Sequence, residues 1–317
     1  MSELYCMHLK RDDCEIREKL FEYCISNGVL GFGWCFLYSQ YGDDAKKPEG
    51  EYKIESIDDF IEAARDYYIN REKKKTLNHS FDCFKGLEVD DLVWTRDPKG
   101  LYYLCRIIEK PKSFFDMELD IGAVVKADFV KIDTSVPGVI VHRFSTSRSP
   151  TIQRIANEYR DNMLNYSKSL YNEKTGNSYY KVNKVKYDLF SLLSGFDLEE
   201  LVIDYLQIKY DYYLSKNSIA FRDTTVSIEC ELFSKKPGEC PIVVQVKGGK
   251  EGSPEITQGL QSFVNNGKKV FLFFTNENYG VLPYGFTSIS KSELYNFAVQ
   301  QKDMLPESIR EWIDLSI

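Results

Sequence analysis

The segment Ile242–Lys247, with the sequence IVVQVK, constrains the fold of this chain more than any other segment. β-Branched residues fill most of it, Pro241 precedes it and a Gly pair follows it, so we predict a buried strand. Because side chains alternate along a strand, Gln245 and Lys247 share one face. A lysine inside a sheet is costly to bury unless a negative group meets it. The segment therefore predicts a sheet that holds a metal ion and a phosphate beside Lys247.

Length and composition narrow the class of protein. The chain has 317 residues, enough for two domains. It has no apolar run near the roughly 20 residues that a membrane span needs, and its start lacks the pattern of a signal peptide. Its eight cysteines form no C-x-x-C pair and only three histidines occur. A zinc site and a disulfide framework are therefore disfavoured, and we expect a cytoplasmic protein with reduced thiols and no membrane partner.

The charge of the chain bears on its partners. The formal net charge is −7, whereas proteins that bind nucleic acid non-specifically are usually basic because phosphate contacts supply their affinity. One local exception is the stretch 143–186, where Lys and Arg outnumber Asp and Glu and five tyrosines are interleaved. Within it, Arg148 and Arg154 are our candidate nucleic-acid contacts. The alternative is a solvated helical linker.

The pattern of elements predicts a two-domain α+β or α/β chain. A Ser/Thr/Pro run over 144–150 marks the boundary. We predict a β-rich domain over 1–150, a basic helical linker over 151–187 and a second domain over 188–317. In the first domain we expect a helix at 56–68, a hairpin of 91–96 with 101–109, and strands at 123–132 and 139–144. In the second we expect helices at 197–210, 254–265 and 290–301, with strands at 218–221, 225–233, 242–247, 270–275 and 286–290.

A set of polar residues on two adjacent strands is the best candidate for chemistry. Alternation along 225–233 places Glu229 and Glu231 on one face, and the next strand of the hairpin carries Gln245 and Lys247. A divalent cation takes carboxylate, amide and water oxygens, and a lysine can hold the attacking water or the phosphate. The alternative is a structural ion pair, in which Glu229 or Glu231 meets Lys247 across the hairpin.

The helix before these strands adds a third acid. Glu199 is followed at helical spacing by Val202, Ile203 and Leu206, so it lies on the apolar stripe. Its neighbour Glu200 lies on a face that we expect to be solvated, with Asp204, Gln207 and Asp211. A carboxylate directed at the core needs a reason, and a metal or water relay is one.

The order of these motifs resembles the PD-(D/E)xK nuclease superfamily. Glu199 matches the helix acid, Glu229 the strand acid, and Gln245 and Lys247 the Q-x-K variant of the Mrr-like restriction endonucleases. The resemblance covers about 188–300 and implies an αβββαβ core with a mixed sheet. It also implies a catalytic set of Glu199, Glu229, Gln245 and Lys247, with Mg²⁺ or Mn²⁺ held by Glu229 and Gln245. Glu231 is an alternative to Glu229, and the G-x-D context usual before the strand acid is missing.

The first domain resembles the EVE and YTH group of PUA-like domains, small β-barrels that read modified bases. Asp91-Leu92-Val93-Trp94 and the later Gly100 and Arg106-Ile107 carry this likeness over about 28–145. A base removed from a duplex is held by stacking on aromatic rings, which Trp34 and Trp94 would supply. The alternative is that both tryptophans belong to the core, as large aromatics usually do.

These resemblances imply a cytoplasmic, Mg²⁺-dependent DNA endonuclease that restricts modified or foreign DNA. It would act as a homodimer, since a double-strand break needs two active sites, and partner proteins of a defence system are possible. The alternative is a non-catalytic module in which a degenerate nuclease core binds nucleic acid or a protein. RNA as the substrate stays open.

Overall fold

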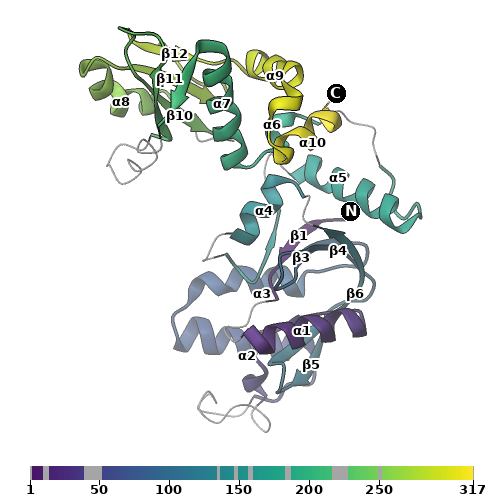
Figure 1. Ribbon diagram of the computed structural model, residues 1–317. Helices are drawn as coiled ribbons and strands as arrows, with labels where there is room; N and C mark the ends of the chain where they lie inside the picture. Colours follow the sequence, from purple (N-terminus) through teal and green to yellow (C-terminus); the bar gives the residue numbers. More distant parts are fainter. Residues whose placement is uncertain are drawn as a thin grey trace. The chain divides into compact units, whose positions relative to one another are not determined.

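The computed structural model describes residues 2–9, 14–38, 52–133, 136–145, 149–155, 160–182, 187–215, 228–248 and 252–316 (Figure 1). The chain divides into two compact units. The first unit consists of Met1–Val136 and Ile140–Lys184, and the second of Pro137–Val139 and Val185–Ile317. Both units mix helices with a β-sheet.

The first unit is built on a curled mixed sheet. Its strand order is β2-β6-β4-β3-β1-β7, and β5 pairs with β6 off this path. The long β6 pairs with β4 over Ala127–Asp133 and with β2 over Ala123–Lys126, so one strand serves both parts of the curl. Among the described strands of this sheet, β1 and β3 pair in parallel and the other pairs are antiparallel. The strand bounds are β1 Leu4–Met7, β2 Val29–Phe32, β3 Leu92–Arg96, β4 Tyr102–Ile107, β5 Lys112–Asp116, β6 Ile121–Asp133 and β7 Ile152–Arg154.

Helices pack on this sheet and enclose the larger core. Side chains of α1, α2 and α3, such as Phe21, Phe60 and Phe84, meet Val93 and Cys105 from the sheet. The Ser56 side chain caps α2 in a capping box with Asp59. The helix bounds are α1 Cys14–Asn27, α2 Ile57–Arg65, α3 Asn78–Lys85, α4 Gly138–Ser145 and α5 Arg160–Thr175, with short turns η1 Cys35–Leu37, η2 Asp66–Arg71 and η3 Lys75–Leu77.

Two segments differ from the sequence prediction. The run 139–144, predicted as a strand, lies in α4, where Ile140 and Phe144 are buried one helical turn apart. Tertiary packing here outweighs the β propensity of a Val/Ile-rich run. The stretch predicted as a linker belongs to the first unit, because β7 pairs antiparallel with β1 and the α5 residue Ser167 accepts a hydrogen bond from Trp94.

The second unit contains a five-stranded mixed sheet in the order β12-β11-β10-β9-β8. Strands β8, β9 and β10 form an antiparallel meander, whereas β11 runs parallel to β10 and β12 parallel to β11. The change of direction follows α8, which connects β10 to β11 as a crossover. The strand bounds are β8 Tyr212–Leu214, β9 Cys230–Ser234, β10 Ile242–Lys247, β11 Lys269–Phe274 and β12 Phe286–Ser288. The strand predicted at 218–221 lies outside the described residues.

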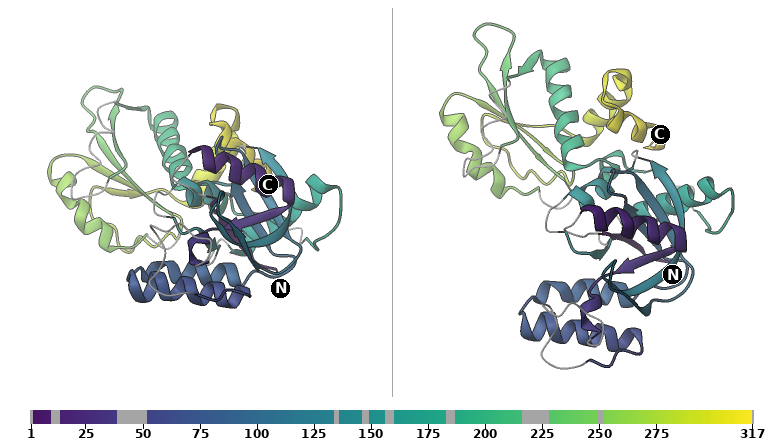
Figure 2. Two further views of the ribbon diagram at one scale, coloured as in Figure 1. Left: turned by 90° about the horizontal axis from the view of Figure 1, so that it is seen from below. Right: turned by 60° about the horizontal axis from the view of Figure 1, so that its bottom comes forward.

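Helices α7 and α8 lie on opposite faces of this sheet (Figures 1 and 2). On the α8 side, Leu260 packs with Val243 and Leu272 in one cluster. On the other side, Tyr210 at the end of α7 meets Phe271 edge-on, with ring centroids 5.5 Å apart. Helix α7 begins at Gly195 with Ser194 as its N-cap, two residues before the start that we predicted at residue 197. The helix bounds are α6 Leu189–Leu192, α7 Gly195–Tyr210, α8 Glu255–Asn265, α9 Lys291–Gln300 and α10 Glu307–Ser316, with the turn η6 Lys302–Met304.

Candidate active site

The pairing of β9 with β10 brings Glu229, Gln245 and Lys247 together. Glu231 stands opposite Val243, so this antiparallel register places Glu229 opposite Gln245. The Gln245 amide nitrogen donates a hydrogen bond to Glu229 Oε1 at 2.7 Å. Lys247 Nζ lies 3.9 Å from the same oxygen. The three side chains therefore share one face of the sheet, at the C-terminal end of β10.

The three side chains of this cluster differ in their exposure to solvent. Gln245 is 1% exposed. The side chains of Lys247 and Glu229 are 25% and 13% exposed. A buried amide that hydrogen-bonds a carboxylate fixes the position of that carboxylate, and the partly open Lys247 stays accessible from outside. The arrangement presents one anchored carboxylate and one cation to an incoming molecule.

The alternative acid, Glu231, has a different partner. Its carboxylate lies 2.8 Å from Lys268 Nζ, and its side chain is 10% exposed. Lys268 also lies over the Phe263 ring, 5.7 Å from the centroid. Glu231, the second residue of β9, thus forms a structural ion pair with Lys268, whereas Glu229 contacts Gln245 and Lys247.

Glu199 lies on α7, which covers the face opposite to Gln245 and Lys247. It is half-buried. The preceding residue, Leu198, approaches the end of β10, because a Cβ placed on Gly248 would lie 3.5 Å from Leu198 Cδ1. Glu199 therefore belongs to the same end of the sheet as Lys247, but it reaches this end from the other face.

Asp204 is a residue that the sequence reasoning missed. We predicted a solvated face for it, yet it is half-buried on α7. Burial and, to a smaller extent, the nearby Glu200 carboxylate together raise the pKa of Asp204 to about 6. The signal in the sequence was the spacing of four residues between two acids on one helix, which brings like charges together.

The donor set fits Mg²⁺ if other ligands complete it. Mg²⁺ is commonly held by one or two carboxylates, with water and substrate phosphate in the remaining positions. Glu229 supplies a carboxylate and Gln245 an amide oxygen, although a cation shared by both requires the Gln245 amide to turn, because its nitrogen faces Glu229. No group of three or more His, Cys, Asp and Glu side chains suited to a metal gathers in the described part of the chain.

The residues predicted to contact nucleic acid in the first unit differ in how far they are buried. Trp94 is fully buried and its indole N–H donates to Ser167 Oγ at 3.0 Å, so the prediction that it stacks on a base is wrong. Trp34 is partly buried and lies edge-on to Phe32, with ring centroids 4.8 Å apart. Arg154 is exposed on β7, and Arg148 lies outside the described residues.

Comparisons with known proteins add no relative. No family model, curated protein or solved structure matches this chain. In the ranges that the structure describes, no helix combines the length and the apolar character needed to cross a bilayer. The function must therefore be inferred from the residues and their geometry.

Proposed function

We propose that the second unit is a divalent-metal-dependent nuclease that hydrolyses phosphodiester bonds in DNA. The observation that carries the proposal is the cluster of Glu229, Gln245 and Lys247 on one sheet face. A carboxylate held by a buried amide, with an ammonium 3.9 Å away, matches the chemistry that phosphate hydrolysis needs. The motif order of the PD-(D/E)xK resemblance and the meander–helix–parallel strand order of the sheet are consistent with it.

Each residue has a distinct role in this proposal. Glu229 and Gln245 would hold the metal, and Lys247 would neutralise the phosphate oxygens or orient the attacking water. Glu199, from the opposite face, is a positioning residue at the same end of the sheet. When bound, Mg²⁺ would lower the pKa of a coordinated water and offset the charge that develops on the phosphate.

The test is cleavage of supercoiled plasmid and linear duplex DNA with Mg²⁺, with Mn²⁺ and with EDTA. We expect wild-type cutting only with a metal. Lys247→Ala and Glu229→Gln should lower the rate about 100-fold or more, because each removes charge stabilisation from the transition state. The matched control is Lys269→Ala, an exposed lysine at the start of β11, which should cut normally. Unchanged cutting by Lys247→Ala would reject the site, and parallel digestion of RNA decides between the two nucleic acids.

A second candidate function is a non-catalytic binding module. The observation that favours it is that Gln245 and Lys247 both contact Glu229 directly, so the three groups satisfy one another as a structural cluster. In that case wild-type protein cuts neither nucleic acid under any metal condition. Glu229→Gln would then lower the free energy of unfolding and nothing else.

Selection of modified or foreign DNA by the first unit, restriction and a homodimer stay predictions. Trp94 has no part in them. Trp34 and Arg154 are the described residues on which recognition by the first unit now rests. The measurement is the affinity for modified and unmodified duplexes of Trp34→Ala and Arg154→Ala.

A further inference from the structure

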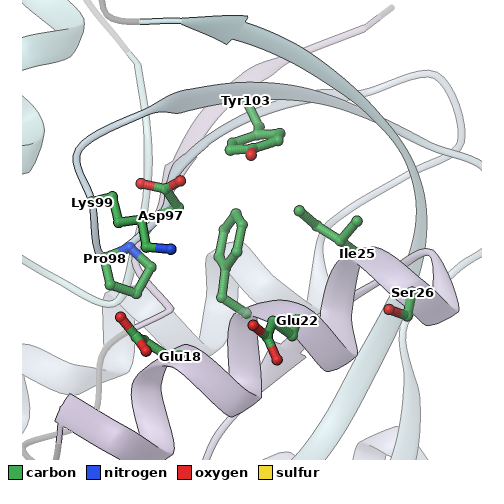
Figure 3. A pocket seen from close by; sticks show the side chains of 9 residues that line it. Glu18, Glu22, Ile25, Ser26, Asp97, Pro98, Lys99 and Tyr103 are labelled. Carbon is green, nitrogen blue, oxygen red and sulfur yellow. The ribbon is translucent and has the colours of Figure 1, made fainter.

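A pocket of about 350 Å³ lies between α1 and the turn that joins β3 to β4 in the first unit (Figure 3). Glu18, Glu22 and Ile25 line it from the helix, and Asp97 and Tyr103 from the hairpin. Figure 3 shows Tyr103 across the opening from the helix, with Asp97 near one end. This volume is within the range of small-ligand sites.

The lining of the pocket carries excess negative charge. Three carboxylates, of Glu18, Glu22 and Asp97, face a single lysine, Lys99. Asp97 uses Oδ1 to accept the Leu101 N–H at 2.8 Å, which closes the turn. Glu18 and Glu22 form no ion pair with any residue that the structure describes, and they stand one helical turn apart, where like charges destabilise a helix. A bound cation would relieve this repulsion.

The walls of the pocket are apolar and aromatic. The rings of Phe21 and Tyr103 contact each other with centroids 5.1 Å apart and planes tilted by 60°. Ile25 is 39% exposed, more than its size would favour on an ordinary surface. Aromatic faces attract cations, and an aliphatic chain can pack on the isoleucine. The pocket thus suits a molecule with a charged head and an apolar stem.

A buried hydroxyl group without a hydrogen-bond partner among the described residues lies next to the aromatic wall of the pocket. Thr95 is 0% exposed, and its Oγ1 has no hydrogen-bond partner among the groups that the structure describes. Thr95 pairs with Tyr103 across the strands and shares a strand face with Asp97, two residues later. Because buried polar groups in native proteins are almost always satisfied, this hydroxyl calls for a partner such as a buried water, but Thr95 lies behind the pocket and is not one of its lining residues.

We propose that this pocket binds an organic cation, an alkylguanidinium or alkylammonium group. The carboxylates supply the charge, Phe21 and Tyr103 the aromatic wall, and Ile25 the contact for the stem. A guanidinium fits best, because its fork of N–H donors matches carboxylates in pairs. The group could belong to a small amine or to an arginine side chain of a peptide. A phosphate backbone is repelled here, so this site is independent of the proposed nuclease activity.

The experiment is titration of the full-length protein by calorimetry and by ligand-observed NMR. The probes are agmatine, the peptide acetyl-Gly-Arg-Gly-amide and butylurea, a neutral molecule of similar shape to the agmatine head and stem. We expect saturable one-to-one binding of a cationic probe and none of butylurea. Binding of agmatine alone indicates a small amine, and binding of the peptide alone indicates an arginine side chain. Binding of both indicates a site for the guanidinium group that the two probes share.

Variants test whether binding occurs in this pocket. Glu18→Gln with Glu22→Gln should weaken binding about 10-fold or more, since two charge-assisted contacts are lost. Lys99→Ala should tighten it, because the only cation of the lining is removed. The matched control Glu62→Gln, an exposed acid on α2, should change nothing. Equal binding of butylurea, an unchanged affinity in the double variant, or no saturable binding of either cation would overturn the proposal.

Discussion

At the scale of residues, Trp94 shows that an aromatic side chain near a predicted binding motif can belong wholly to the core. Its indole N–H donates to Ser167, which is itself 1% exposed. Trp94→Phe leaves the Ser167 hydroxyl buried without its partner, so we expect a loss of about 1–3 kcal/mol in the free energy of unfolding. DNA affinity should not change. Urea denaturation and a binding titration measure the two quantities.

The matched control is the double variant Trp94→Phe with Ser167→Ala. Because it removes both partners, it should recover much of the stability that the single variant loses. Weaker DNA binding by Trp94→Phe at unchanged stability would instead restore the base-reading role.

Asp204 gives a prediction about pH. Burial first, and then Glu200, raises the pKa of Asp204 from 3.8 to about 6 in the folded protein. The folded state therefore holds this proton more tightly than the unfolded state, and stability falls as the pH rises from about 4 through 6. Asp204→Asn removes this loss, so it should stabilise the second unit at pH 7.5 by up to about 3 kcal/mol.

Urea denaturation at two pH values checks this sign. The gain of Asp204→Asn over wild type should be absent near pH 4, where Asp204 is protonated in both states. Glu200→Gln should give a smaller gain at pH 7.5, because it removes only the second cause of the shift. A gain at pH 4 as large as that at pH 7.5 would contradict the assignment.

At the scale of elements, strands with a clear alternation of side chains could be predicted from the sequence, whereas segments whose pattern fits both a helix and a strand could not. The pairing of β3 with β4 and the shared face of Glu229, Gln245 and Lys247 followed from period-two patterns and hairpin connections. The helix α4 was predicted as a strand, because its Val/Ile run fits both structures until packing decides. The three-residue strand β7 is too short to leave a pattern, and it forms because β1 offers an unpaired edge.

Part of the candidate site could not be predicted from the sequence. Nothing in the chain indicated that Glu231 pairs with Lys268 rather than Lys247, because Lys268 lies after α8 and comes close only through the crossover. Helix α7 and the Gln245 side chain lie on opposite faces of the sheet, and this arrangement likewise depends on how the helix packs. Local periodicity fixes a residue's own face, whereas partners far along the chain are set by tertiary structure.

The start of α7 carries a prediction at this scale. Ser194 Oγ accepts the Asp197 N–H at 3.1 Å, and Asp197 accepts the Ser194 N–H at 3.0 Å. Ser194→Ala should cost about 1 kcal/mol, the usual value of an N-cap. Thermal unfolding of this variant and of Ser56→Ala, the same capping box on α2 in the first unit, should show similar losses. No loss in either would mean that water replaces the cap without cost.

At the scale of the whole molecule, the boundary between the units decides which pieces of the chain can fold. The Ser/Thr/Pro run suggested a division near residue 150, whereas the compact first unit extends to Lys184. Three interactions tie the later segment to it: Ile152 pairs with Met7, Ser167 accepts from Trp94, and Arg160 forms an ion pair of 2.6 Å with Glu3. A turn-rich composition marks a surface loop, and such a loop need not end a domain.

We therefore predict that a fragment of residues 1–184 folds and that a fragment of residues 1–150 does not. Removal of 151–184 exposes Trp94 and the edge of β1, both buried in the intact unit, and an uncovered strand edge favours aggregation. Near-ultraviolet circular dichroism and urea denaturation of both fragments provide the measurement. The longer fragment should unfold in one cooperative transition, and the shorter one should lack fixed aromatic signals. A soluble fragment of 1–150 that unfolds cooperatively would show that the first unit folds without β7 and α5. Residues 151–184 would then be a linker.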